Sequence, residues 1–137
     1  RGSLGGSSVR AMLDTSVLVG RIPDVVVDGI EQYSASFLVR GELARGLGRF
    51  RSDPRATHLA RMRAELLSAL DALPAFWRPF DASASDAYGR LRAEPHAAAR
   101  TKDALIAAHA LAFGVPLLTA DRGFTRFADL ELEVIQA

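Results

Sequence analysis

The hydrophobic pattern of the chain alternates between short apolar runs and longer segments with helical spacing. Apolar runs bounded by turn residues predict strands over residues 9–13, 30–36, 76–80, 115–121 and 131–137. Helical segments are predicted between them, over residues 15–20, 37–50, 54–73, 83–94, 101–113 and 122–130. Strands that alternate with helices over the whole length predict a layered α/β domain with a mostly parallel central sheet flanked by helices.

Capping residues support the boundaries of these helices. Ser36 is placed to cap the second helix, and Pro54 follows Asp53 at the start of the third. Pro95 predicts the end of the fourth helix. Gly114 occupies the usual position after the fifth, which has the strongest helical pattern in the chain.

The length and composition of the chain fit one globular domain. With 137 residues, 49% of them hydrophobic, the chain can form one core, and a second independent core would be too small. We expect the domain to span residues 9–137, because the Gly- and Ser-rich residues 1–8 resemble a flexible tail or a cloning remnant. No apolar stretch approaches the roughly 20 residues of a membrane-spanning helix, so we expect no membrane association.

Cysteine is absent from the sequence, which excludes disulfide bonds and thiolate metal sites. Any metal ion must therefore be held by oxygen or histidine ligands. A chain without cysteine suits a reducing compartment, and we expect a cytoplasmic protein. The histidines His58, His96 and His109 fit no ligand spacing and are interpreted as surface or packing residues. Trp77 is interpreted as a core or interface residue.

Positive charge is distributed unevenly on a chain whose net charge is only +1. All but one of its 17 cationic residues are arginine, and Lys102 is the exception. Between Arg40 and Arg63, seven arginines face only Glu42 and Asp53, a local excess of five positive charges. Two interpretations remain open: a basic surface for an anionic polymer, or a GC-rich coding bias without a function.

Two acidic residues lie on faces of predicted helices that otherwise look buried. In the helix over residues 37–50, Glu42 falls about 60° from Val39, inside the apolar arc, and Gly46 one turn on leaves space beside it. Asp103 lies in the first turn of the helix over residues 101–113, which is apolar around almost its whole circumference. Burial of these positions would ordinarily forbid a charge.

Two further acids, Asp14 and Asp121, follow directly on predicted buried strands. They therefore belong to the carboxyl edge of the sheet, where ligands bind in open α/β folds. No cation pairs obviously with any of the four acids. A shared divalent cation such as Mg²⁺ or Mn²⁺ would explain their burial together.

Each acid taken alone has a second interpretation. Asp14 could cap the short helix that follows it, and Asp103 could be favoured by a helix dipole. Glu42 could form a buried salt bridge with an arginine, and Asp121 could be a turn residue.

Three segments resemble the successive motifs of a known family: "MLDTSVLVG", "SFLVRGELARGL" and "TKDALIAAHALAFGVPLLTADRGF". The chain resembles PIN-domain ribonucleases over residues 9–137, and most of all the VapC toxins of bacterial toxin and antitoxin pairs. This resemblance implies a PIN-like three-layer α/β fold. It also implies catalytic, metal-binding roles for four acids and supporting roles for two hydroxyl residues, namely Asp14, Glu42, Asp103, Asp121, Ser16 and Thr119.

The activity implied by the resemblance is metal-dependent endoribonuclease cleavage of structured RNA, such as tRNA or a ribosomal RNA loop. Asp14, Asp103 and Asp121 would bind Mg²⁺, for which Mn²⁺ could substitute, and Glu42 would act through water or orient the nucleophile. Arg100 and Lys102 are candidates to hold a phosphate.

The resemblance also implies a homodimer and a cognate antitoxin. The helix over residues 54–73 could offer a groove to an antitoxin helix, or could simply pack on its own domain, through Leu59, Met62, Leu66, Leu67 and Leu70.

Other functions are compatible with an aspartate after the first strand. A phosphatase of the aspartate type would need a second aspartate where Ser16 stands. A receiver domain would need an adjacent acidic pair and a phosphoacceptor in a middle strand, and neither is found. A catalytically silent PIN-like domain that binds RNA or protein remains the alternative.

Overall fold

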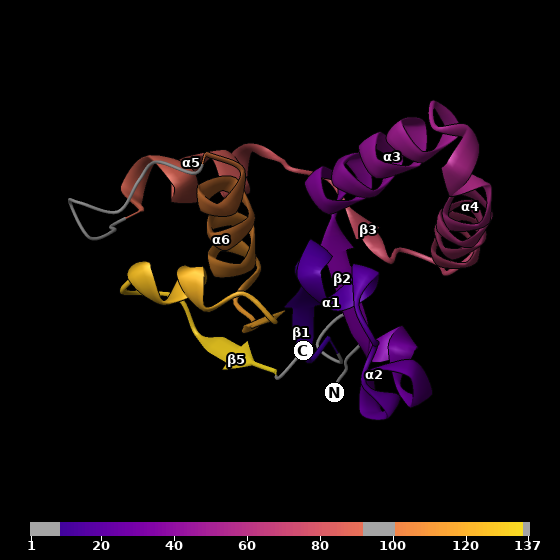
Figure 1. Cartoon of the computed structure of the whole chain (residues 1–137). Helices are drawn as coiled ribbons and strands as arrows, with labels where there is room; N and C mark the ends of the chain where they lie inside the picture. The colour runs from indigo at the N-terminus through magenta and orange to yellow at the C-terminus, as the bar shows by residue number, and fades with distance from the viewer. Residues whose placement is uncertain (1–8, 92–100, 136–137) are drawn as a thin grey trace.

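A single parallel sheet organises the molecule (Figure 1). The computed structural model describes residues 9–91 and 101–135. Its strands are β1 (Ala11–Leu13), β2 (Tyr33–Ser36), β3 (Trp77–Arg78), β4 (Leu117–Thr119) and β5 (Leu132–Val134). They are ordered β3-β2-β1-β4-β5, and every neighbouring pair is parallel. The predicted α/β fold with a mostly parallel sheet is therefore confirmed.

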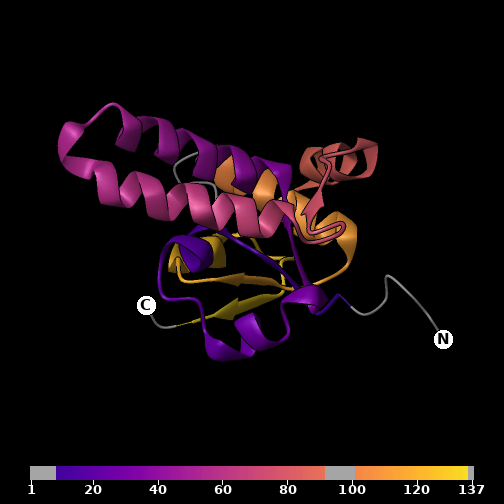
Figure 2. The same ribbon diagram turned by 90° about the vertical axis from the view of Figure 1, so that its right-hand side faces the viewer.

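Helices cover this sheet in layers. The α-helices are α1 (Thr15–Val19), α2 (Asp24–Asp28), α3 (Phe37–Arg51), α4 (Thr57–Asp71), α5 (Ala82–Arg90) and α6 (Thr101–Phe113). Figures 1 and 2 show α3 and α4 side by side as a helical hairpin, and α5 packed against α6. In Figure 2, α2 lies on the side of the sheet away from this hairpin. Short 3₁₀ helices span Ile30–Gln32, Pro54–Ala56 and Arg122–Arg126.

Several boundaries differ from those predicted. The strand predicted from residue 30 begins at Tyr33, because the preceding three residues form a 3₁₀ turn. The helix predicted over 83–94 ends at Arg90, before Pro95, which lies outside the described residues. Helix α2 was not predicted, since its three consecutive valines lack helical spacing, and only Val26 among them is buried.

The predicted caps at Ser36, Asp53 and Gly114 are present. The Ser36 hydroxyl accepts a hydrogen bond from the Leu38 amide at 3.1 Å, which fixes the start of α3. Asp53 accepts from the Arg55 amide at 2.9 Å at the start of the 3₁₀ turn that leads into α4. Gly114 ends α6 with a φ of +75°, a conformation that favours glycine.

The central strands are buried on both faces. Every residue of β1 and β4 is buried, and the Phe124 and Phe127 rings contact each other beside them. In α6, Ala107, Ala108 and Ala110 are buried, so small side chains allow the helix to pack closely. This dense core holds the ends of the strands in fixed positions.

His109 and Trp77 have packing roles, as predicted. His109 is buried in α6 and meets the Phe80 ring edge-on at 5.5 Å. Burial lowers the pKa of His109. Trp77 meets Phe76 edge-on at 4.9 Å and donates to the Asp71 carboxylate at 2.7 Å. Of the other histidines, His58 is exposed and His96 lies outside the described residues.

The apolar residues of α4 divide into two groups. Leu67 and Leu70 are buried, and Leu66 packs against the core, so this part of α4 packs on its own domain. Leu59 and Met62 are exposed, at 48% and 53%.

Within residues 9–91 and 101–135, no helix has the length and apolar character needed to cross a bilayer.

Two glycines predict opposite effects of alanine on stability. Gly114→Ala should lower the free energy of unfolding by about 1–2 kcal/mol, because alanine is strained at a φ of +75°. Gly48→Ala, in the interior of α3, where a Cβ would meet no neighbouring atom, should raise it by about 0.5–1 kcal/mol. Urea unfolding of both variants measures the two changes, and equal effects would contradict this account of Gly114.

Candidate active site

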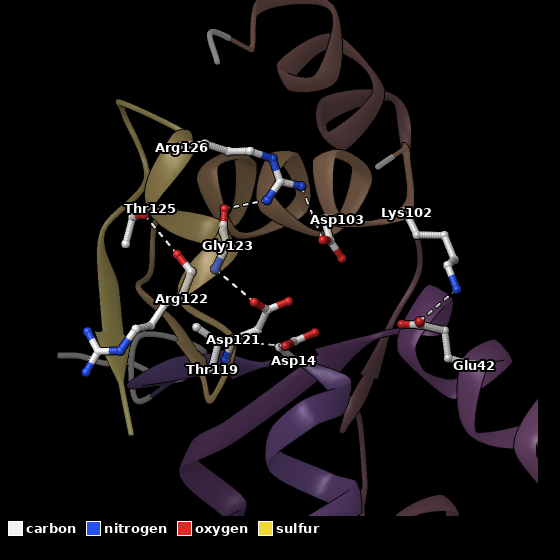
Figure 3. Close-up of polar contacts among 10 residues, drawn as sticks. All are labelled: Asp14, Glu42, Lys102, Asp103, Thr119, Asp121, Arg122, Gly123, Thr125 and Arg126. Carbon is white, nitrogen blue, oxygen red and sulfur yellow. Dashed lines mark hydrogen bonds and ion pairs between the residues drawn. The ribbon is translucent and has the colours of Figure 1, made fainter. Parts of the chain in front are cut away.

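The four predicted acids all lie toward the carboxyl edge of the sheet (Figure 3). Asp14 directly follows β1, and Asp121 stands two residues after β4. Glu42 belongs to α3, which follows β2, and Asp103 lies in the first turn of α6. Figure 3 shows the Asp14 and Asp121 side chains next to each other, Asp103 above them, and Glu42 farther off on α3. Parallel pairing of β1 with β4 brings Asp14 and Asp121 together.

Asp14 is the buried member of the group, with 5% of its surface exposed. Its Oδ2 accepts hydrogen bonds from the Ser16 hydroxyl at 2.7 Å and the Thr119 hydroxyl at 2.8 Å. Asp14 holds the N-cap position of α1 but makes no side-chain capping bond there. The hydroxyls of Ser16 and Thr119, predicted as supporting groups, therefore act on Asp14.

Backbone amides orient these two hydroxyls. The Ala120 amide donates to Ser16 Oγ at 2.9 Å, and the Asp121 amide donates to Thr119 Oγ1 at 2.9 Å. Each hydroxyl has one proton, so accepting from an amide leaves that proton to be donated to Asp14. The loop after β4 thus fixes the orientation of the Asp14 carboxylate.

The pKa of Asp14 is raised above its ordinary value, chiefly because the carboxyl is buried. The two hydroxyl hydrogen bonds offset part of this effect, and the negative charge of Asp103 adds to it. The site therefore holds more negative charge than its surroundings compensate.

Asp121 has a structural role as well as its place in the site. Its Oδ1 accepts from the Gly123 amide at 2.8 Å and caps the 3₁₀ helix Arg122–Arg126. The turn role considered for Asp121 is thus present alongside its position near Asp14. Its side chain is half-buried.

The expectation that no cation pairs with the acids is wrong for two of them. Lys102 Nζ lies 3.2 Å from Glu42 Oε2, and Arg126 Nη2 lies 3.2 Å from Asp103 Oδ2. Glu42 also accepts from the Thr15 hydroxyl at 2.5 Å. The side chains of Glu42 and Asp103 are 24% and 18% exposed, so both stand at the rim of the site rather than in the core.

The salt bridge considered for Glu42 exists, but its partner is lysine instead of arginine. Lys102 had been expected at a phosphate, and its side chain is 71% exposed. Arg100, the other predicted phosphate ligand, lies outside the described residues.

Two residues of the site were missed by sequence reasoning. The sequence predicts no partner for Thr15, yet its hydroxyl donates to Glu42 in α3. No pattern in the sequence pointed to Arg126. Its guanidinium nevertheless donates to the Gly123 carbonyl and to the Asp103 carboxylate, and so connects the loop after β4 to α6. Both contacts join segments that are distant in the sequence, and no local pattern predicts them.

The fit of the site to a metal ion depends on its donors and on their positions. Asp14, Asp103 and Asp121 offer the carboxylate oxygens that Mg²⁺ and Mn²⁺ prefer. As the side chains stand, no three acidic or histidine residues of the described part are grouped to hold one ion. Holding one ion with all three aspartates would therefore require their carboxylates to move from these positions.

Comparison with known proteins identifies the family. The family model of the PIN domain matches residues 11–130, most of the chain. The chain belongs to the PIN domain family. No curated protein sequence matches this PIN domain.

Solved structures of toxin-antitoxin proteins share the fold of this PIN domain. VapBC-5 of Mycobacterium tuberculosis, of the VapBC family of toxin-antitoxin systems, is 24% identical with a TM-score of 0.70 over 94% of this chain and 99% of that one. VapBC2 of Rickettsia felis, bound to a promoter DNA fragment, is 23% identical with a TM-score of 0.66 over 90% and 96%. VapBC-1 of nontypeable Haemophilus influenzae is 20% identical with a TM-score of 0.64 over 90% and 96%.

Removing the buried negative charge of Asp14 should increase the stability of the folded protein. Because the folded state raises the pKa of Asp14, ionising this group at neutral pH costs folding stability. Asp14→Asn should therefore unfold at a higher temperature than the wild type at pH 7 without divalent cations. The advantage should vanish below about pH 4, where the wild-type carboxyl is protonated.

Asp86→Asn, at an exposed position in α5, is the matched control and should unfold with the wild type. Thermal unfolding between pH 3.5 and pH 8 makes the comparison. An Asp14→Asn protein less stable than the wild type at pH 7 would show that the carboxylate is fully compensated.

Proposed function

We propose that this PIN domain is a VapC-like toxin, a metal-dependent endoribonuclease that cleaves structured RNA such as tRNA or a ribosomal RNA loop. The observation that carries the proposal is the gathering of Asp14, Asp103 and Asp121 at one edge of the sheet, with Glu42 nearby on α3. Family membership and the similarity to VapBC structures support it. These residues match the acids of the family motifs one by one.

The proposed metal ligands are Asp14, Asp103 and Asp121, with Mg²⁺ as the natural ion and Mn²⁺ as a substitute. When bound, the ion would polarise a phosphate oxygen and lower the pKa of a coordinated water. In this proposed site, the hydroxyls of Ser16 and Thr119 hold the carboxylate of the ligand Asp14 in one orientation.

Glu42 is proposed to orient the attacking water or to bind the metal through water. Thr15 fixes one Glu42 oxygen at 2.5 Å, and Lys102 neutralises the other at 3.2 Å. We expect Lys102 to leave Glu42 and bind a phosphate when metal and RNA enter the site. Its exposed side chain makes this exchange easy, because exposed ion pairs contribute little stability.

A cognate antitoxin and a second copy of the chain are the proposed protein partners. The similar structures come from VapBC toxin-antitoxin systems, which supports an antitoxin for this chain as well. Leu59 and Met62 on α4 are exposed apolar residues on which an antitoxin helix could pack.

A catalytically silent PIN domain that binds RNA or protein is the second candidate. It is favoured by the pairing of Glu42 and Asp103 with the chain's own cations, because paired carboxylates need no metal. The two candidates differ in whether divalent cations bind and in whether RNA is cut.

Loss of a single acid should abolish cleavage. Asp14→Asn and Asp103→Asn should each lower cleavage by at least about 100-fold, the scale for losing one group that stabilises transition-state charge. The measurement maps new RNA 5′ ends after brief expression of each variant in bacteria. Sharp cuts in one RNA class should occur with the wild type and Asp86→Asn and be absent from the two site variants.

The same proteins test the metal separately from activity. Millimolar Mn²⁺ or Mg²⁺ should raise the unfolding temperature of the wild type and of Asp86→Asn, and should not raise that of Asp14→Asn. If the wild type neither cuts RNA nor is stabilised by these ions, the nuclease proposal is wrong and the catalytically silent PIN domain is favoured.

Removing Lys102 should strengthen metal binding while weakening RNA binding. Lys102→Met should lower the dissociation constant for Mn²⁺ about two- to fivefold, the scale of an exposed ion pair. Titration calorimetry measures it, and Arg61→Met, at an exposed position in α4, is the control. Weaker Mn²⁺ binding by Lys102→Met would mean that the lysine supports the carboxylate geometry instead of competing with the ion.

A further inference from the structure

A cavity of about 460 Å³ lies beside the acidic site, between α3 and α6. Thr15, Glu42 and Lys102 belong to both, so the cavity and the site are continuous. Its volume lies within the range of small-ligand pockets.

The cavity combines an apolar wall with a basic rim. Phe50 and Leu105 contribute apolar surface, while Arg45 and Arg49 stand one turn apart on the exposed side of α3. Arg63 adds a third guanidinium to the lining. This composition suits a ligand that has both an apolar ring and a negative charge.

Arg63 is held in place as part of this wall. It reaches from α4 to α3, donates to the Leu43 carbonyl at 3.3 Å and lies 5.2 Å from the centre of the Phe50 ring. A side chain at Gly46 would collide with Arg63 Nη1. The space predicted beside Gly46 thus receives an arginine, and Arg63 and Phe50 form a stacked pair.

Ion pairs engage two of the seven arginines of the predicted basic cluster. Arg40 binds Asp71 through two hydrogen bonds of 2.9 and 2.7 Å, and Arg55 lies 3.5 Å from Asp53. Arg45, Arg49 and Arg63 line the cavity instead. Arg51 and Arg61 are exposed outside the lining, so three of the seven arginines of the cluster stand next to the acidic site.

We propose that this cavity binds one unpaired nucleotide of the RNA, next to the bond that is cut. The base packs against Phe50 and Arg63, and Arg45 and Arg49 contact the phosphates beside it. This inference rests on the proposed function. Continuity with the acidic site favours RNA over a protein ligand, since the strand that carries the cleaved bond must pass Glu42.

Binding of short RNA separates the base contact from the phosphate contacts. In an Asp14→Asn background, fluorescence anisotropy compares a single-stranded hexamer with an abasic hexamer of the same backbone. The hexamer with bases should bind about five- to 100-fold more tightly, the scale of one stacked base. Phe50→Leu should remove most of this difference. Phe37→Leu, an exposed phenylalanine on the same helix outside the cavity, should preserve it.

Arginine variants test the rim. Arg49→Gln should weaken both hexamers equally and reduce the salt dependence of binding by about 0.7 in slope, the value for one phosphate contact on a single strand. Arg51→Gln, on the same helix but outside the lining, should leave the slope unchanged. Gly46→Ala displaces Arg63 and should likewise remove most of the difference in affinity between the two hexamers. It takes the place of Phe50→Leu in this test if Phe50→Leu unfolds at a lower temperature than the wild type.

Cleavage mapping on a randomised RNA distinguishes this inference from the nuclease proposal. If the wild type cuts, and Phe50→Leu cuts with a weaker base preference at one position next to the cut, both the nuclease proposal and the nucleotide site are supported. If the wild type cuts and Phe50→Leu and Arg49→Gln behave like their controls, the nucleotide site is wrong. If the wild type neither cuts nor binds RNA, both are overturned.

Discussion

The crowding of negative charge at the carboxyl edge of the sheet is the constraint on which the rest of the structure depends. Parallel pairing of β1 with β4 forces Asp14 and Asp121 to the same edge, and α6 adds Asp103. A buried carboxylate is costly unless it is hydrogen-bonded or paired. The fold supplies both, as two hydroxyls on Asp14 and an arginine on Asp103.

These compensating contacts differ in how easily they can be exchanged. The hydroxyls on Asp14 are fixed by backbone amides and belong to the folded core of the site. Lys102, whose side chain is 71% exposed, pairs with Glu42, whereas Arg126, only 14% exposed, pairs with Asp103. Glu42 and Asp103 are therefore paired with cations of the chain, while the charge of the buried Asp14 is only partly compensated by its two hydroxyl partners.

Helix α3 connects the acidic site to the cavity beside it. Glu42 is placed at the site, while Arg45, Arg49 and Phe50 continue along the same helix. The hairpin of α3 and α4 allows Arg63 to complete the wall, because Gly46 leaves room for its guanidinium. One rigid helix thus sets the position of the acidic group relative to the basic surface.

Local patterns in the sequence determined the alternating strands and helices, the caps at Ser36 and Gly114, and the positions of the four acids on these elements, since each depends on neighbours within a few residues. The pattern did not predict α2, because three adjacent valines resemble a strand. Only the tertiary structure decided which charges meet. The contacts of Thr15 with Glu42, Arg126 with Asp103 and Arg63 with Phe50 join separate elements, so they depend on packing distances that no local periodicity records.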